Sequence, residues 1–307
     1  MRSQRIPQRT QSFNDMQLSV VIITFNEEAN IGRTLQSVQP LVAGGKGEII
    51  VVDSGSADRT VEIAKSFGAK VFVEEWKGFA AQKNSALRKA TGDWVLSLDA
   101  DEEVSIELGT EIAELLTLSP GKTLQKISVR GAWDAWVECR TDLTVVYEDE
   151  REGPLAGAAI PRKNLFMHRW IRRGGFYPDC KLRLFKRGSA AFENRLVHED
   201  AHINGFTVAL SGALIHHSYP TLSDYIEHMN RYSSLGAEMV VAKGKVRFSF
   251  INIVVRPMFT FLYNYFFRLG FLDGREGLLM HLYHAVYVSW KYAKAWELSR
   301  QKNTLSS

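Results

Sequence analysis

The sequence predicts an α/β fold with a mostly parallel sheet, followed by a helical, aromatic-rich C-terminal region. Four apolar runs, beginning with LSVVIITF at 18–25, are typical of strands buried on both faces. A segment with apolar residues at helical spacing follows each run, so strand and helix alternate four times in about 100 residues. Residues 248–298 combine helical spacing with many aromatic side chains. These observations place helices on both faces of a parallel sheet and further helices after it.

The four strands are expected at 18–25, 48–53, 70–75 and 93–99. Asn26 is expected to cap the first helix, with Glu27 and Glu28 in its acidic first turn. Gly68 should end the second helix. The third and fourth helices are expected at 79–90 and 105–118.

The second half of the chain is less regular. Residues 126–157 contain strand-like runs whose register the sequence does not place, whereas 181–188 alternate as a strand does. Thr221 should open a helix, with Asp224 completing a capping box. We expect a disordered tail at 1–15, a main domain at 16–220 and a helical C-terminal region at 221–307.

Composition excludes several classes of protein. Apolar residues make up 45% and charged residues 23% of the 307 positions, as in an ordinary globular protein. The formal charge of +4 does not suggest a nucleic-acid partner. The two cysteines form neither a disulfide framework nor a metal-ligand spacing, so a reducing cytosol is the expected compartment. The basic N-terminus lacks the apolar stretch of a signal peptide.

The most apolar stretch, 248–271, is a weak candidate for crossing a membrane. It is interrupted by Arg256, Pro257, Asn264 and Arg268. No acid occurs from Val241 to Leu272, although five basic residues do. Basic and aromatic residues together favour an anchor on an anionic membrane surface, and the alternative is an aromatic face that covers the protein's own core.

Carboxylates gather where the fourth strand ends, in LSLDADEE at 96–103. Ligands of parallel sheets bind at the carboxyl ends of the strands. Asp99 and Asp101, two residues apart, can direct one carboxylate at Mg²⁺ or Mn²⁺ and the other at a ribose or water. Such a pair alone is more often a pair of solvated loop acids, but here it ends a buried strand. Glu102 and Glu103 are expected to be solvated.

Other polar residues are candidates for the same edge of the sheet. Asp53 follows the second strand, where its carboxylate could accept an N–H from a nucleobase, while Ser56 and Asp58 could serve only the turn. Lys83 would by default lie on a solvated helix face. Arg231 could clamp a diphosphate with paired hydrogen bonds, or pair with an acid.

Two histidine-containing segments carry further candidates. In His198-Glu199-Asp200, either acid could act as general base toward an acceptor hydroxyl, or the loop could merely satisfy its own polar groups. His216 or His217 could supply a nitrogen ligand to a metal, although a lone histidine near a strand end is more often structural. Adjacent residues of a strand cannot both face one ion.

Taken together, these segments resemble a known family. VVIITFNEEANI, VVDSGSADRT, GFAAQKNSAL and GDWVLSLDADEE, in this order over 18–105, resemble the nucleotide-sugar domain of family 2 inverting glycosyltransferases. GGFYPDCKLRLFKRG, RLVHE, LIHHSY with NRYSS, and GFLDGREGL extend the likeness to bacterial lipopolysaccharide core β-glucosyltransferases. The resemblance covers most of the chain, least clearly 126–157.

The resemblance implies a GT-A (Rossmann-like) fold, a UDP-sugar donor and a Mg²⁺ or Mn²⁺ cofactor. It places Thr24, Asn26 and Glu27 around the uridine, Asp53 at the uracil, Lys83 at the nucleoside and Asp99 at the ribose. Asp101 would bind the metal, with His216 and Arg231 near the diphosphate. Glu199 would be the general base, in preference to Asp200.

The expected activity is inverting transfer of a hexose, glucose above all, to a lipid-linked saccharide such as the lipopolysaccharide inner core. The enzyme would be cytoplasmic and peripheral on the inner face of the cell membrane. One alternative is transfer to polyprenyl phosphate, for which the basic segment 162–187 could form a cationic pocket. The other is a non-catalytic nucleotide-sugar-binding protein, which would not be expected to retain both Asp101 and the acids of RLVHED.

Overall fold

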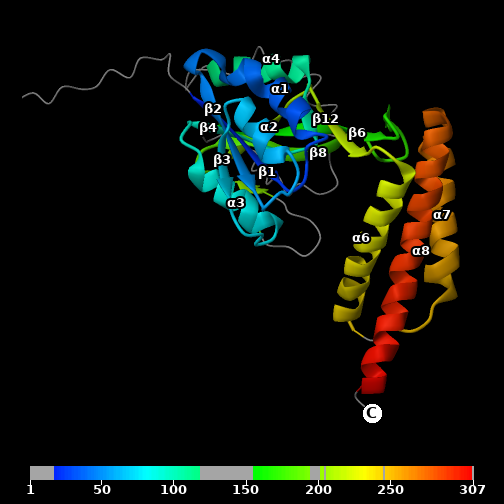
Figure 1. The fold of residues 1–307 in the computed structure, drawn as a ribbon. Coiled ribbons are helices and arrows are strands. Elements are labelled where there is room, and N and C mark those ends of the chain that lie inside the picture. The colour runs from blue at the N-terminus through cyan, green and yellow to red at the C-terminus, as the bar shows by residue number, and fades with distance from the viewer. Residues whose placement is uncertain (1–16, 118–154, 194–200, 204, 245, 306–307) are drawn as a thin grey trace, which may run out of the picture.

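The computed structural model describes residues 17–117, 155–193, 201–203, 205–244 and 246–305. Figure 1 shows two parts, a twisted sheet flanked by helices and, beside it, a group of helices from the C-terminal end of the chain. The expected tail at 1–15 and most of 126–157 lie outside the described residues. Glu199 and Asp200 also lie outside them.

The first four strands form the parallel half of the sheet, in the order β3-β2-β1-β4. They are β1 (Leu18–Thr24), β2 (Gly47–Asp53), β3 (Lys70–Val73) and β4 (Trp94–Asp99). The helices that follow them are α1 (Ile31–Val42), α2 (Thr60–Ser66), α3 (Phe79–Lys89) and α4 (Ile106–Thr117). A short helical turn, η1 (Ala43–Gly45), follows α1. The predicted alternation is confirmed, with element ends that differ by a few residues.

The sheet continues beyond β4 with strands from the second half of the chain, in the order β8-β6-β12-β5. These strands are β5 (Glu102–Val104), β6 (Leu155–Phe166), β8 (Asp179–Lys186) and β12 (Leu214–Tyr219). β8 is antiparallel to both β4 and β6, while β12 is parallel to β6 and antiparallel to β5. Two more strands, β7 (Arg169–Trp170) and β11 (Phe206–Ala209), pair with β6, and β9 (Ala190–Phe192) pairs with β10 (Ala201–Ile203).

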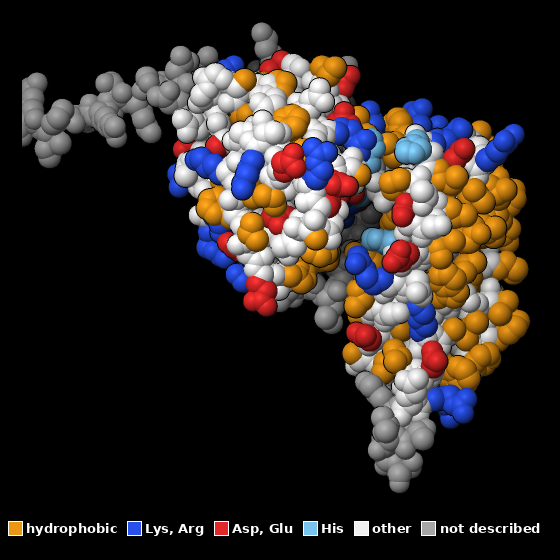
Figure 2. Space-filling model, in the orientation of Figure 1, with side chains coloured by type: hydrophobic (Ala, Val, Ile, Leu, Met, Phe, Trp, Pro, Cys, Tyr) orange, Lys and Arg blue, Asp and Glu red, His pale blue; other side chains and the backbone are white. Residues whose placement is uncertain are grey.

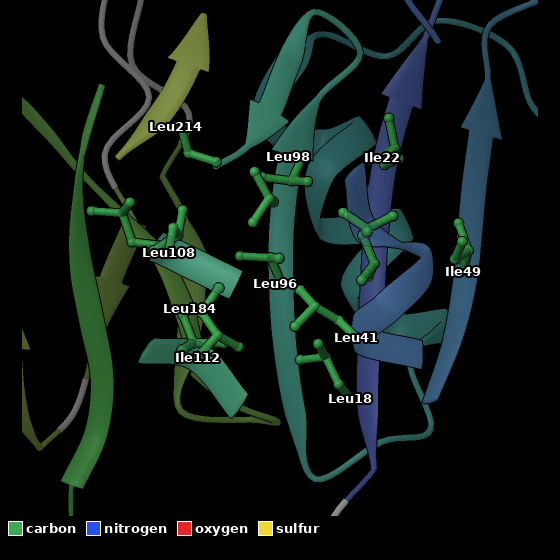
Figure 3. Close-up of a cluster of buried hydrophobic side chains, with 14 of the residues drawn as sticks. Leu18, Ile22, Leu41, Ile49, Leu96, Leu98, Leu108, Ile112, Leu184 and Leu214 are labelled. Carbon is green, nitrogen blue, oxygen red and sulfur yellow. The ribbon is translucent and has the colours of Figure 1, made fainter. Parts of the chain in front are cut away.

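The sheet is buried on both faces, as the apolar runs predicted. One core cluster packs β1, β2 and β4 against α1 and α4, and Figure 3 shows Leu18, Ile22, Leu96 and Leu98 among its members. A second cluster lies on the opposite face under α3. In β1 the side chains of Val20 and Ile22 enter the first cluster and that of Val21 enters the second, because successive strand residues point to opposite faces.

The remaining helices follow β12. They are α6 (Leu222–Ala242), the π-helical turn η2 (Ile251–Val255), α7 (Arg256–Leu262), the π-helical turn η3 (Tyr263–Phe267), the short helix η4 (Gly270–Asp273) and α8 (Gly274–Leu305). α8 lies between α6 and α7 (Figure 1). The capping box predicted at Thr221 and Asp224 is present. A third cluster, formed by Phe166, Ile171, Tyr225 and Met280, joins the sheet to α6 and α8.

Among the described helices, none is both long enough and apolar enough to cross a membrane.

Two local predictions were wrong. α1 begins at Ile31 with Asn30 in the N-cap position, and Asn26 instead has a left-handed backbone with φ of 54°. Asn26 does not cap a helix, because its backbone N–H and its side-chain oxygen form hydrogen bonds with the turn after β2. The expectation that the cysteines form no disulfide also fails, since Cys180 at the start of β8 is disulfide-bonded.

Candidate active site

The carboxyl ends of β1 and β2 lie side by side, because Thr24 and Asp53 are register partners in the parallel ladder. The Thr24 hydroxyl donates to Asp53 Oδ2 at 2.9 Å. Asp53 is fully buried, and it also accepts hydrogen bonds from the Ser56 hydroxyl and from the backbone N–H groups of Gly55 and Ser56. This carboxylate, predicted to meet a nucleobase, therefore already shapes the turn that follows β2.

Polar contacts join the β1–α1 loop to the β2–α2 loop. The Asn26 N–H donates to the Ser56 hydroxyl at 2.8 Å, and the Glu27 N–H donates to the Thr60 hydroxyl at 2.7 Å. Burial raises the pKa of Glu27, and the negative charges of Asp101, Asp58 and Asp99 add to the rise although a hydrogen bond from Asn30 opposes it. Thr24, Asn26 and Glu27 thus lie on one edge with Asp99, which ends β4, and with Asp101, two residues after it.

Asp99, at the end of β4, is held by two cations. Lys83 Nζ from α3 lies 2.9 Å from Asp99 Oδ1, and Arg183 from β8 bonds Asp99 Oδ2. Burial alone would raise the pKa of Asp99, but the charges of Arg183 and Lys83 hold it well below its usual range. Lys83 is therefore not a solvated helix residue as its default interpretation had it. Its side chain is buried beside the site.

Glu102 contradicts its predicted solvation, because its side chain has no exposed surface. It lies on the short strand β5, where Arg183 Nη2 approaches its Oε1 at 2.6 Å and Arg162 Nη1 approaches at 3.1 Å. Its other oxygen accepts the Asp99 N–H at 3.0 Å. Burying a carboxylate requires such compensation. Glu103 is half-buried and contacts His217 at 3.2 Å.

A chain of polar contacts runs from Glu102 to β12. Arg162 on β6 bonds Asp179 Oδ2, and Asn164 Nδ2 donates to the same oxygen at 3.1 Å. Asn164 Oδ1 in turn lies 2.7 Å from His216 Nδ1. This network fixes the imidazole of His216 from behind, because register pairs Asn164 with His216 across β6 and β12.

Asp101 and His216 face each other, with His216 Nε2 at 3.2 Å from Asp101 Oδ2. The Asn164 oxygen at Nδ1 favours the tautomer with its proton there, which leaves a lone pair on Nε2 aimed at the carboxylate. A lone pair and an anion in this arrangement suit a divalent cation between them, with the second partner of the imidazole setting its orientation. His217 turns to Glu103, as the alternation along a strand requires.

The residues present therefore fit a Mg²⁺ or Mn²⁺ ion, with one carboxylate oxygen and one imidazole nitrogen. In the described part of the chain no group of three or more His, Cys, Asp or Glu side chains surrounds one point. Two protein ligands are typical of Mg²⁺ sites in which phosphate oxygens and water supply the others.

Aromatic side chains from the first half of α6 and from the end of β12 lie beside this pair. His228 and Tyr232 stack with ring centroids 4.2 Å apart, and Tyr219 meets His228 edge-on at 5.3 Å. Burial, together with the charges of Arg231 and His216, lowers the pKa of His228 to about 4, although the charge of Asp101 opposes the decrease. Arg231 is exposed and stacks over Tyr232 at 5.6 Å, so it borders the site without bonding Asp101. Figure 2 shows a hollow between the sheet part and the helices.

The structure thus brings together most of the predicted site residues. It places these on one edge: Thr24, Asn26, Glu27, Asp53, Lys83, Asp99, Asp101 and His216. Sequence reasoning missed Arg183, Arg162, Asp179 and Asn164. The segment KLRLFKRG could have flagged Arg183, because a charged side chain between two leucines of a predicted strand needs a compensating partner once that strand is buried.

The chain is similar to known glycosyltransferases. The model of the glycosyl transferase family 2 matches residues 19–119. An uncharacterized glycosyltransferase of Rickettsia typhi is 31% identical over 301 residues, which cover 94% of this chain and 90% of the relative. A lipopolysaccharide core biosynthesis glycosyltransferase of Rhizobium meliloti is 28% identical over 287 residues, covering 91% and 92%.

Among solved structures, glucosyl-3-phosphoglycerate synthase of Mycobacterium tuberculosis, in complex with Mn²⁺, UDP and glucosyl-3-phosphoglycerate, is 29% identical. The match covers 32% of this chain and 40% of the synthase, with a TM-score of 0.26. This chain belongs to glycosyl transferase family 2 and has the GT-A fold that its sequence predicted.

Proposed function

We propose that this glycosyltransferase moves a hexose, glucose above all, from a UDP-sugar to a hydroxyl of a lipid-linked saccharide, with inversion at the anomeric carbon. The observation that carries the proposal is the pair formed by Asp101 and His216, 3.2 Å apart at the carboxyl edge of the sheet. Hydrogen bonds hold both residues in orientation, His216 through its side chain and Asp101 through its backbone, as a site that binds a metal-diphosphate requires.

The edge of the sheet would receive the donor nucleoside. Thr24, Asn26 and Glu27 would line the uridine, Asp53 the uracil and Asp99 the ribose. The backbone of the joined loops and the buried charges around Asp99 support these roles, because they hold the groups in place before the donor binds. Lys83 would keep Asp99 ionised and approach the nucleoside, while Arg231 would reach the diphosphate from α6.

Asp101 and His216 would hold the Mg²⁺ or Mn²⁺ ion. When bound, this ion would supply positive charge against the charge that builds up on the departing diphosphate. The protein's own part is to orient the two ligands. Asn164 does so for His216, and the backbone of β12 does so for Asp101, whose carbonyl accepts the His217 N–H at 3.0 Å.

The base would come from RLVHED, which lies outside the described residues and leads directly into β10. Glu199, rather than Asp200, would take the proton of the acceptor hydroxyl as its oxygen attacks the anomeric carbon. A carboxylate on the face opposite the leaving diphosphate gives inversion in a single displacement, as in the one-step inverting glycosidases.

Two observations support a lipid-linked acceptor: the name of one relative and the exposed apolar side chains of the C-terminal helices. The Rhizobium meliloti relative is named for lipopolysaccharide core biosynthesis. A lipid-linked acceptor would place the enzyme on the inner, cytoplasmic face of the membrane. Transfer to polyprenyl phosphate is less favoured, because Arg162 and Arg183 of the basic segment are already paired with Glu102, Asp99 and Asp179. A non-catalytic role is not expected of a chain that keeps both Asp101 and the acids of RLVHED.

The test is the variant D101N, compared with D93N at the opposite end of the same strand. UDP release is measured from UDP-glucose with heptosylated lipid A as acceptor and with Mn²⁺ or Mg²⁺ varied. We expect D101N to lose more than about a hundredfold in turnover, as expected when charge stabilisation of a leaving group is removed. D93N, exposed and distant, should behave as the unmodified enzyme. Near-normal turnover of D101N both with excess Mn²⁺ and without it would exclude the metal role.

A further inference from the structure

The helices beyond α6 expose an unusually apolar surface. Most of the exposed large apolar side chains in the described chain lie at 248–282, on η2, α7, η3, η4 and the start of α8. The exposed apolar side chains of this range are called the apolar face below. Phe267 is 78% exposed, Ile251 66% and Phe259 64%, which is unusual for side chains of this size.

The apolar face is continuous. Phe259 stacks on Tyr263 with centroids 6.0 Å apart, and Tyr263 stacks on Phe267 at 6.2 Å. These rings form a ladder along one side of α7 and η3, because residues four apart share a helix face. In Figure 2 hydrophobic side chains cover the side of the helical part that lies away from the sheet.

The burial pattern of this segment is inverted. From Phe248 to Leu272, every exposed residue is apolar except Arg256 and Arg268. The uncharged polar residues of this segment, Ser249, Asn252, Thr260 and Asn264, are only partly exposed. On its inner side the Ser289 hydroxyl of α8 donates to the Ile253 carbonyl at 2.8 Å. A surface helix in water has its charged face outside. This segment is therefore arranged for an apolar environment on its outer side.

The charges around the apolar face indicate which environment that is. Arg247 is exposed just before this range, Arg256, Arg268 and Arg275 are exposed within it, and the sequence has no acid from Val241 to Leu272. A second copy of the chain docked through the same face would bring these like charges together. An anionic lipid surface would pair with them while the aromatic rings enter the acyl boundary.

We propose that the apolar face docks the protein flat on an anionic lipid bilayer, with the rings of Phe259 and Phe267 inserted and the arginines at the headgroups. α8 packs its other side on α6, whose first half carries His228 and Arg231 beside the Asp101–His216 pair. Docking through α7 thus keeps α6 and the candidate active site on the aqueous side. The inference names the membrane partner of the proposed function, but it does not need that function, because binding is measured without turnover.

The test is flotation of the full-length protein with vesicles of phosphatidylcholine alone or with about 30% phosphatidylglycerol, the anionic lipid that the basic rim should prefer. We expect binding to the anionic vesicles at low salt and a clear loss at high salt, since screening weakens exposed charges. F259S/F267S should weaken binding by about tenfold or more, because each exposed ring would otherwise be buried in lipid. R247Q/R275Q should weaken it on anionic vesicles alone.

The matched control is I106S on α4, which removes an apolar side chain that is 88% exposed on a different surface. It should bind vesicles as the unmodified protein does, and far-UV circular dichroism should be unchanged for all variants. Failure to float with anionic vesicles at low salt would overturn the proposal, as would equal losses in I106S and F259S/F267S. A dimer in lipid-free solution that F259S/F267S dissociates would assign the apolar face to a second copy instead.

Discussion

Glu102 is the residue on which the acidic cluster depends for its structure. Its side chain is fully buried between Arg162 and Arg183, and one oxygen also accepts the Asp99 backbone N–H. We expect E102Q to lower the free energy of unfolding by about 3 kcal/mol, because removing one partner of a buried ion pair leaves charges uncompensated. Urea unfolding followed by circular dichroism measures the loss.

The comparison for this variant is E103Q, one residue along the same strand. The Glu103 side chain is 30% exposed, contacts His217 at 3.2 Å and lies 4.0 Å from the exposed Arg33. Partly exposed pairs contribute little, so E103Q should cost less than about 1 kcal/mol. Equal losses in the two variants would mean that the burial of Glu102 does not determine its contribution.

These two acids also show what the sequence could and could not predict of the site. The position of Asp99 and Asp101 at the end of a buried strand was visible in LSLDADEE, because that pattern is local. The burial of Glu102 was not, because it depends on Arg183, which lies 81 residues away in the chain. A carboxylate in an acidic run looks solvated until the fold brings its cations, so pairings between distant strands are the part that pattern reasoning misses.

At the scale of elements, Glu48 connects three strands and a turn at the end of the sheet where the parallel strands begin. Its carboxylate on β2 accepts hydrogen bonds from the Ser19 hydroxyl of β1, from Lys70 Nζ of β3, and from the hydroxyl and N–H of Thr91, at 2.7–2.8 Å. Burial alone would raise the pKa of Glu48, but these bonds lower it to about 2. Three strands and the turn before β4 therefore share one anion.

This network predicts a stability that depends on pH. A carboxyl whose pKa is lower in the folded state stabilises the fold above its unfolded pKa of about 4.5, and the contribution is lost as the pH falls toward 2. At pH 7 the free energy of unfolding of E48Q should be lower than that of the unmodified protein by about 1–3 kcal/mol, because hydrogen bonds are lost. The gap should narrow between pH 5 and pH 2. E62Q, whose carboxylate makes only an exposed pair with Arg59, should show neither effect. A gap that stays constant down to pH 2 would contradict the assignment.

Unlike most strands from β5 onward, the elements of the first half were largely predictable, because strands buried on both faces are apolar throughout and need no partner to be recognised. The exception was the start of α1, where NEEAN has the residues of a helix cap. In the fold this segment bonds the loop after β2 instead, with the Glu27 N–H on Thr60 and the Glu28 N–H on Asp58. Local capping chemistry was outcompeted by contacts between loops about 30 residues apart.

At the scale of the whole molecule, the sheet part and the helical part meet at the Gly174–Gly175 turn between β7 and β8. The Gly174 N–H donates to the Arg268 carbonyl at 3.0 Å, and Asp273 Oδ2 accepts the N–H groups of Arg172 and Arg173. His281 of α8 packs directly on Gly174. If the apolar face rests on a membrane, this contact determines how the sheet part is held above it.

Replacing Gly174 by alanine tests how rigidly the two parts are joined. Gly174 has φ of 68°, and an added Cβ would come within 1.8 Å of His281 Cε1, in a ring that has little room to move. Gly188 is the matched control, because its φ is 81° and nothing lies within 4 Å of an added Cβ.

G188A should cost about 1 kcal/mol of unfolding free energy for the left-handed backbone alone. G174A should cost about 2 kcal/mol more, since overpacking adds to the strain. Urea unfolding gives both values, and limited proteolysis should release the helical part faster in G174A. Equal costs would mean that His281 yields freely, so that the two parts are not rigidly joined at this turn.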